Sequence, residues 1–160
     1  MSSPGNRYPR LRGRFHLESP DDLQVIIHDG GQHITDRLPE LVWVRLTGCQ
    51  GEAFTGVVLN KPVHLQSVVR GSQILFIMPE GGPYPLQVTP QYLEERPQWR
   101  LLAPCRECGL TELFGPPSEL LAASFPSVTT DQLSRGFTFT TRCRLCGDGV
   151  VVRIKRANRP

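Results

Sequence analysis

Two short cysteine motifs are the residues of this chain whose types and spacing predict chemistry. The segments 105–109, with the sequence CRECG, and 143–147, with the sequence CRLCG, each end in a glycine. A C-x-x-C turn directs two thiolates at one centre, and two such turns supply the four ligands of a tetrahedral metal site. The glycine after each second cysteine can adopt a positive φ without strain. We therefore predict a metal site formed by Cys105, Cys108, Cys143 and Cys146.

The ligand set also indicates which metal is bound and in what role. Four protein ligands leave no open position for a substrate, so structural zinc is favoured over catalytic zinc. Iron in the same cage of four sulfurs is the alternative, because tetrahedral thiolate coordination suits both metals. A redox dithiol would require a C-x-x-C that opens a helix, whereas both motifs have strand-like or irregular surroundings. Free thiols without metal are the remaining alternative, and Cys49 is expected to be an ordinary residue near a turn.

Strands and short helices are expected around the motifs. Strands at Trp99–Ala103 and Phe137–Thr141 should enter the two motifs, and a strand at Val150–Ile154 should leave the second. The 34 residues between Cys108 and Cys143 are too many for a bare loop. We expect two helices there, Ser118–Ser124 with an N-cap serine and Thr130–Arg135 ended by Gly136.

The first part of the chain has the pattern of a small β-rich fold. Short apolar runs alternate with turns rich in glycine, proline and asparagine, which favours a curled antiparallel sheet or barrel. A helix with Thr89 as its N-cap is expected to follow. The expected strands are Leu23–Ile27, Leu41–Leu46, Ala53–Leu59, Val63–Leu65 (an edge strand) and Ile74–Met78, and the helix is Gln91–Arg96.

The fold class predicted from these elements is α+β. We expect a disordered arm at 1–14, a β-rich domain at 15–100, a zinc-ribbon region with short inserted helices at 101–155 and a basic tail at 156–160. A chain of 160 residues is long enough to bury a core of its own.

Two resemblances accompany this reading. The cysteine motifs look like those of zinc ribbons, although Arg106 and Arg144 stand where that family often has proline and the spacer is longer than in compact ribbons. Upstream, the segments 39–48 (PELVWVRLTG), 54–62 (FTGVVLNKP) and 71–76 (GSQILF) resemble a family of small, β-rich bacterial proteins of unknown function. This second resemblance implies a bacterial, cytoplasmic protein and implies no reaction.

Charge and composition bear on the partner. The formal net charge is +3, and four thiolates with Zn²⁺ carry −2, which brings the metallated chain to +1. Such a charge is a weak argument for nucleic acid, so we expect a protein partner and a non-enzymatic interaction module. We find no signal peptide and no stretch of transmembrane length, so we expect a reducing, cytoplasmic location and no membrane partner.

Two alternative functions remain open. Arginines beside the motifs and the basic C-terminus would contact phosphate in a nucleic-acid-binding protein, although Arg106, Arg142 and Arg144 fit better a local role that offsets the charge of the metal centre. His28 and His33 flank a Gly-Gly turn with Asp29 and Asp36 nearby, and together they would form an acid–base or second metal site in an enzyme. Their spacing matches no catalytic motif, so polar loop residues that hold a turn are the favoured reading.

Overall fold

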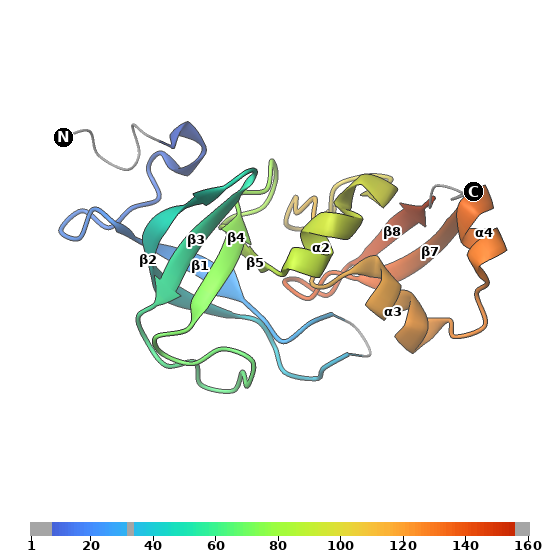
Figure 1. Ribbon diagram of the computed structural model, residues 1–160, viewed down its shortest axis with the longest axis horizontal. Coiled ribbons are helices and arrows are strands. Elements are labelled where there is room, and N and C mark those ends of the chain that lie inside the picture. Colours follow the sequence, from blue (N-terminus) through green and yellow to red (C-terminus); the bar gives the residue numbers. More distant parts are fainter. Residues whose placement is uncertain (1–7, 32–33, 156–160) are drawn as a thin grey trace.

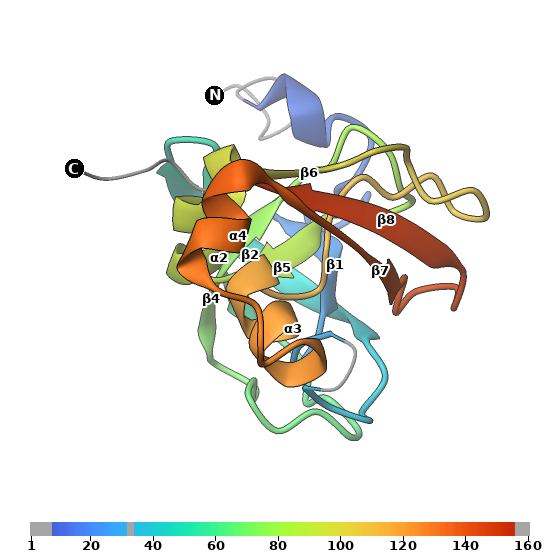
Figure 2. The same cartoon turned by 90° about the vertical axis from the view of Figure 1, so that its right-hand side faces the viewer.

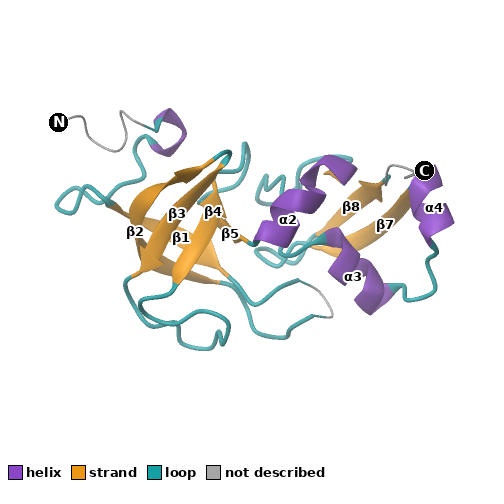
Figure 3. Ribbon diagram, viewed as in Figure 1, coloured by secondary structure: helices purple, strands orange, loops and turns teal. Residues whose placement is uncertain are grey.

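The computed structural model of the chain describes residues 8–31 and 34–155 and shows a small α+β fold (Figure 1). Five strands form a closed barrel: β1 (Asp22–Ile27), β2 (Glu40–Gln50), β3 (Ala53–Val58), β4 (Gln73–Ile77) and β5 (Leu86–Val88). A second sheet has the order β6-β8-β7, with β6 at Trp99–Leu101, β7 at Phe137–Arg142 and β8 at Gly149–Ile154. The helices are α2 (Pro90–Glu95), α3 (Pro117–Ser124) and α4 (Thr130–Arg135), with 3-10 turns η1 (Pro9–Leu11) and η2 (Arg96–Gln98). Figure 3 shows α3 and α4 beside the second sheet and α2 between this sheet and the barrel.

The barrel closes through a parallel pair, which corrects the expectation of a purely antiparallel sheet. Successive strands from β1 to β5 pair antiparallel, and β1 meets β5 in parallel at Ile26 and Leu86. In a five-stranded meander the first and last strands run in the same direction, so an odd number of strands can close only in this way. Strand β5 itself was not predicted.

The inside of the barrel is filled by alternating residues of its strands. Leu23, Val25 and Ile27 of β1 point inward and are fully buried, as the period of two requires. Phe54 and Phe76 stack with their ring centroids 5.6 Å apart. Leu11 of η1 is also fully buried in this core, so residues 8–14, predicted as part of a disordered arm, are folded against the barrel. Residues 1–7 of the predicted arm lie outside the described part of the chain.

Residues 63–65 do not form the predicted edge strand. Their three backbone N–H groups donate to the side-chain carboxylate of Glu40, at distances of 2.6, 2.9 and 3.0 Å. A carboxylate that accepts several N–H groups replaces the strand ladder as their hydrogen-bond partner, and it holds the loop against the start of β2. The same interactions lower the pKa of Glu40 against the effect of burial, which acts in the opposite direction.

The outer surface of the barrel and the C-terminal part of the chain share a second core. Ile26, Leu86 and Val88 point outward from the barrel and are nevertheless buried, because they pack into a cluster with residues that follow β5. Members of this cluster from the later elements include Tyr92, Trp99, Leu110, Leu120, Phe139 and Val152. Each part would therefore expose apolar side chains to solvent if the other part were absent.

A buried polar network fixes α2 in this second core. The Tyr92 hydroxyl donates to Glu112 at 2.7 Å and accepts from the backbone N–H of Leu113 at 2.9 Å. Arg96 donates to the other Glu112 oxygen at 3.0 Å, and its guanidinium lies 4.4 Å from the centre of the Trp99 ring. Burial raises the pKa of Glu112 although the bonds from Tyr92 and Arg96 favour its ionised form. The network joins α2 to the segment that follows the first cysteine motif.

The predicted helices are present, with one change at a cap. Thr89 caps α2 by accepting from the N–H of Tyr92, and Thr129 and Gln132 form a capping box at α4. Helix α3 begins at Pro117 rather than after Ser118, so Ser118 is not its N-cap. Pro117 takes the first helical position, where no N–H donor is needed, and the Ser118 hydroxyl donates to Glu95 of α2 at 2.5 Å.

Candidate metal centre

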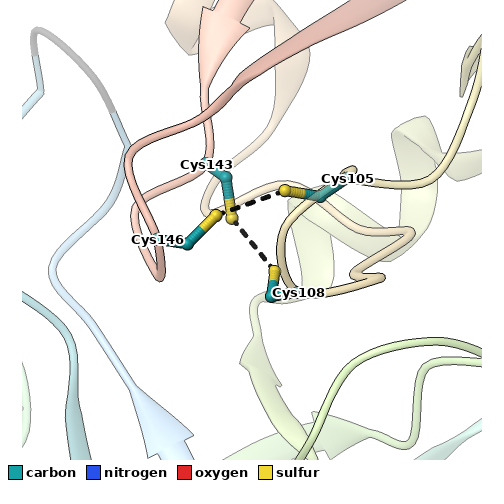
Figure 4. Close-up of side chains that lie close together, drawn as sticks. All are labelled: Cys105, Cys108, Cys143 and Cys146. Atoms are coloured by element: carbon teal, nitrogen blue, oxygen red, sulfur yellow. Dashed lines mark hydrogen bonds between the residues drawn. The ribbon is translucent and has the colours of Figure 1, made fainter.

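The structure brings together the sulfur atoms of Cys105, Cys108, Cys143 and Cys146. All four Sγ atoms lie within 4.8 Å of one another, and their side chains point toward a common centre (Figure 4). Two of the separations are 3.3 Å, between Cys105 and Cys146, and 3.7 Å, between Cys108 and Cys143. A tetrahedron with Zn–S distances of about 2.3 Å has edges of about 3.8 Å. The cluster is therefore of the right size to hold a metal ion of the zinc type.

The two motifs have the same backbone conformation. In the first, the N–H of Cys105 donates to Leu110 O at 2.9 Å and the N–H of Gly109 donates to Cys105 O at 2.8 Å. In the second, Cys143 donates to Asp148 O at 2.8 Å and Gly147 donates to Cys143 O at 2.7 Å. Gly109 and Gly147 have φ values of 77° and 84°, a region that side-chain-bearing residues rarely adopt. The glycines thus close both turns as the sequence pattern requires.

Backbone N–H groups of each motif act on the sulfurs. Burial raises the pKa of Cys105, but hydrogen bonds from the N–H of Cys108, the Cys146 thiol and the N–H of Glu107 outweigh it and leave the pKa lowered. Burial dominates at Cys108 and Cys143 and raises the pKa of both thiols, although N–H groups of their own motifs favour the thiolates. A bound cation would supply the missing stabilisation of these thiolates, because a coordinated thiol is deprotonated outright. The donor set and its surroundings fit Zn²⁺ in a site with four protein ligands.

Strand pairing positions the second motif. Strand β7 leads into Cys143 and β8 leaves after Asp148, and their ladder ends at the pair of Arg142 and Gly149. The second motif is therefore the turn of the β7–β8 hairpin. The chain reaches the first motif from β6, whose pairing with β8 is extended by a hydrogen bond from Leu102 N–H to Val151 O at 3.0 Å. Strand β8 thus places both motifs at one end of the second sheet.

The barrel also holds both motifs. The loop between β4 and β5 lies so close to the first motif that a Cβ on Gly81 would be 1.9 Å from Gly109 O. Arg144 of the second motif donates through Nη2 to the carbonyls of Thr35 and Arg37, at 3.0 and 3.1 Å. Its role is therefore to fasten the motif to the barrel loop before β2. Nothing in the sequence pattern indicated these contacts, since each joins segments more than 25 residues apart.

The surroundings of His28 are those of a structural residue. The ring of His28 donates from Nε2 to Gln87 O at 2.9 Å and accepts at Nδ1 from the N–H of Gly30 at 3.1 Å. Both nitrogens are therefore engaged in the neutral tautomer, and the ring packs edge-on against Phe114. The carboxylate of Asp29 accepts from the N–H groups of Gln66 and Ser67 and from the Arg37 guanidinium. The Ser67 hydroxyl also donates to this carboxylate, and together these bonds outweigh burial and hold the pKa of Asp29 well below its usual range.

Of the other two residues of the predicted acid–base site, only Asp36 lies in the described part of the chain. Asp36 is exposed, and His33 lies outside the described residues. Among the described residues, the two groups predicted to do acid–base work, His28 and Asp29, both have their polar atoms committed to holding the turn and the loop around Ser67. This arrangement agrees with the favoured reading of these residues as turn-holding groups.

Protonation of His28 predicts a pH dependence of stability. Burial, which outweighs the opposing effects of Gln87 O and Asp29, lowers the pKa of His28 from 6.5 to about 4. The unfolded chain therefore binds the proton more tightly, so stability is fully present above pH 6.5 and is lost as the pH falls toward 4. The loss between pH 7 and pH 5 is expected to be about 2 kcal/mol. Urea unfolding should show this loss, and His28→Gln should have a smaller pH slope; equal slopes would contradict it.

Cys49 lies apart from the other four cysteines. It is exposed near the end of β2, where it pairs with Phe54, and its thiol does not belong to the cluster. Replacement by serine is therefore expected to leave the metal content of the purified protein unchanged. Elemental analysis of Cys49→Ser beside the unmodified chain measures this directly, and a loss of metal would make Cys49 a ligand.

No helix of residues 8–31 and 34–155 combines the length and apolar character needed to cross a bilayer.

Comparison of the chain with protein-family models, with curated proteins and with solved structures gives no match. The resemblances to zinc ribbons and to small bacterial proteins accordingly stay predictions. What can be concluded is that four cysteines, on two motifs with matching backbone hydrogen bonds, form a cluster that can hold a metal ion.

Proposed function

We propose that the chain is a non-catalytic interaction module that binds a protein partner and whose region 101–155 is a zinc ribbon. The observation that carries the zinc is the cluster of four Sγ atoms within 4.8 Å on two matching motifs. Cys105, Cys108, Cys143 and Cys146 would hold Zn²⁺, and the ion would supply a cross-link between the segments before and after the inserted helices. A reducing compartment such as the cytoplasm would keep these thiols available for the metal.

A non-catalytic role follows from the chemistry available around the site. Four protein ligands leave no coordination position for a substrate, and the cysteines make a closed site. The other predicted catalytic region has its His28 and Asp29 side chains fixed by hydrogen bonds within the fold. The other two perturbed carboxyl groups among the described residues are also engaged, because Glu40 accepts from the N–H groups of residues 63–65 and Glu112 is bonded to Tyr92 and Arg96. These groups position elements of the fold, which suits a module that presents a surface.

Native mass spectrometry with elemental analysis tests the proposal. Protein purified without added metal should carry one zinc ion per chain, bound through thiolates that are protected from alkylation until a chelator is added. Iron in the same site would be recognised by its visible absorption and would change the metal while keeping the four ligands. A chain without metal, with four titratable thiols or a disulfide, would overturn the zinc ribbon and return the redox alternative to consideration.

A further inference from the structure

The outer face of the second sheet has an unusual distribution of charge. Strands β6, β7 and β8 contain three arginines and no acidic residue. The register places Arg100, Arg153 and Thr138 in one row across the sheet, and Leu102, Val151 and Thr140 in the next. We call the residues Arg100, Leu102, Thr138, Val151, Arg153 and Lys155 the basic face. Figure 2 views the molecule from the end at which β7 and β8 lie in front of the barrel.

We propose that the basic face docks an extended, acidic segment of a partner protein. The inference rests on the proposed function and specifies its partner. It starts from Arg100 and Arg153, which stand directly opposite each other on neighbouring antiparallel strands. Like charges in this position repel, and none of the ion pairs among the described residues involves Arg100, Arg153 or Lys155. A bound carboxylate would relieve this repulsion and would accept from both guanidinium groups.

The Arg153 side chain and the Lys155 backbone are also held in place before any partner arrives. Arg153 donates through Nη1 to the Thr138 hydroxyl at 3.3 Å, and its guanidinium lies against Gly136, where a Cβ would approach Nη2 to 2.6 Å. The backbone of Lys155 is fixed by a bond from its N–H to Gln98 O at 2.8 Å. Arg100, Arg153 and Lys155 border a groove of about 340 Å³ with Pro97, Gln98 and Trp99. Groups fixed in advance lose less conformational entropy on binding.

The row beside the cations is apolar and exposed. Leu102 and Val151 are 52% and 37% exposed, and they are neighbours across β6 and β8. Successive side chains of an extended chain point in opposite directions. A segment in which acidic and apolar residues alternate, and which runs between the two rows, would therefore direct its acidic side chains at the cations and its apolar side chains at the apolar row. Such a partner would bury the apolar row and pair with the basic row at the same time.

The placement of aromatic residues favours protein over nucleic acid. Sheets that bind single-stranded nucleic acid present aromatic rings on their open face, where bases stack. Here the aromatic residues of the three strands, Trp99, Phe137 and Phe139, all turn inward and pack in the second core. The net charge of about +1 for the zinc-loaded chain also supplies no strong long-range attraction to a polyanion. Local complementarity to carboxylates is the better match.

Fluorescence anisotropy with the zinc-loaded full chain tests the inference. The probe is a labelled peptide of about twelve residues that alternates glutamate and valine. Binding of a labelled oligonucleotide of equal charge is measured for comparison. The peptide should bind at low salt, and the double variant R100Q/R153Q should weaken binding about tenfold and reduce its salt dependence. L102S should weaken binding while leaving the salt dependence unchanged. The matched control R12Q/R70Q removes the same charge from exposed positions near the barrel and should bind normally.

Each contrary result has a definite meaning. Failure of the peptide to bind, or equal binding by R100Q/R153Q and R12Q/R70Q, would overturn the assignment of this face. Tighter binding of the oligonucleotide than of the peptide would overturn the assignment of a protein partner. Zinc content is measured on the same samples, so a chain with one zinc that ignores the peptide refutes this inference alone. A chain without zinc refutes the proposed metal centre whatever the peptide does.

Discussion

Replacement of Cys143 by serine is expected to release the metal and to unfold the second sheet. Structural zinc in small domains contributes about 10–16 kcal/mol of apparent binding free energy at neutral pH, and this free energy is also folding free energy. Cys143 is buried at the start of the β7–β8 turn, so a serine there leaves a poor ligand in the middle of the cluster. Elemental analysis should find metal lost from Cys143→Ser, and a variant that keeps one metal per chain would show that the four-cysteine site is wrong.

The barrel should respond to the same substitution differently. Its inner core, which includes Val25, Val42 and Phe76, has no contribution from the cysteine motifs, so it is expected to persist. Its outer face would lose partners, because Ile26, Leu86 and Val88 pack against the C-terminal elements. Hydrogen exchange should therefore show lost protection in β7 and β8 and retained protection in β1 to β4, with a barrel that unfolds at a lower urea concentration. Simultaneous loss of all protection would mean that the barrel cannot fold alone.

Substitution of Gly81 by alanine is expected to separate the barrel from the first motif. The added Cβ would lie 1.9 Å from Gly109 O, a backbone atom that cannot swing aside as a flexible side chain would. Relief requires movement of the β4–β5 loop or of the turn that carries Cys105 and Cys108. Such overpacking is expected to cost about 3 kcal/mol in the free energy of unfolding. Urea unfolding of the zinc-loaded protein measures this cost, and competition with a chromophoric chelator measures the accompanying loss of zinc affinity.

Gly149 provides the matched control. It lies in β8, two residues after the second motif, but a Cβ there would meet Thr140 Cγ2 at 3.7 Å, which is ordinary van der Waals contact. Gly149→Ala should therefore have nearly the stability and zinc affinity of the unmodified chain. If Gly81→Ala behaved in the same way, the close approach of the barrel loop to the first motif would be wrong.

Local patterns were sufficient to predict the elements and the cysteine cluster. Each motif carries its own turn, with the glycine that the positive φ requires, so the convergence of two cysteines follows from five consecutive residues. The helix α2 was likewise indicated by its cap Thr89, and α4 by Gly136 at its end, while the cap Thr129 of α4 is known only from the structure. In these places the information that determines the structure lies within one turn of the residues concerned.

What could not be predicted depends on contacts between distant segments. Strand β5 has three residues between prolines and is recognisable only through its pairing with β1 and β4. Residues 63–65 look like a strand, but the carboxylate of Glu40, 23 to 25 residues away, takes their N–H groups. The bonds from Arg144 to carbonyls of the barrel loop could not be predicted from the residues around Cys143 and Cys146. The net charge of the whole chain likewise does not indicate that β6, β7 and β8 bring arginines together on a sheet without acidic residues.

The parallel pair that closes the barrel has a consequence for synthesis on the ribosome. Ile26 of β1 can pair with Leu86 of β5 only after the 60 residues that separate them have been synthesised. At about 5–20 residues per second, the nascent chain carries β1 with one open edge for about 3–12 s. A barrel can form once β5 has left the exit tunnel, yet the apolar outer face of β5 stays uncovered until the cysteine-bearing segments follow. The nascent chain needs protection from edge-to-edge association until β5 closes the barrel, and its apolar outer face needs cover until the cysteine-bearing segments follow.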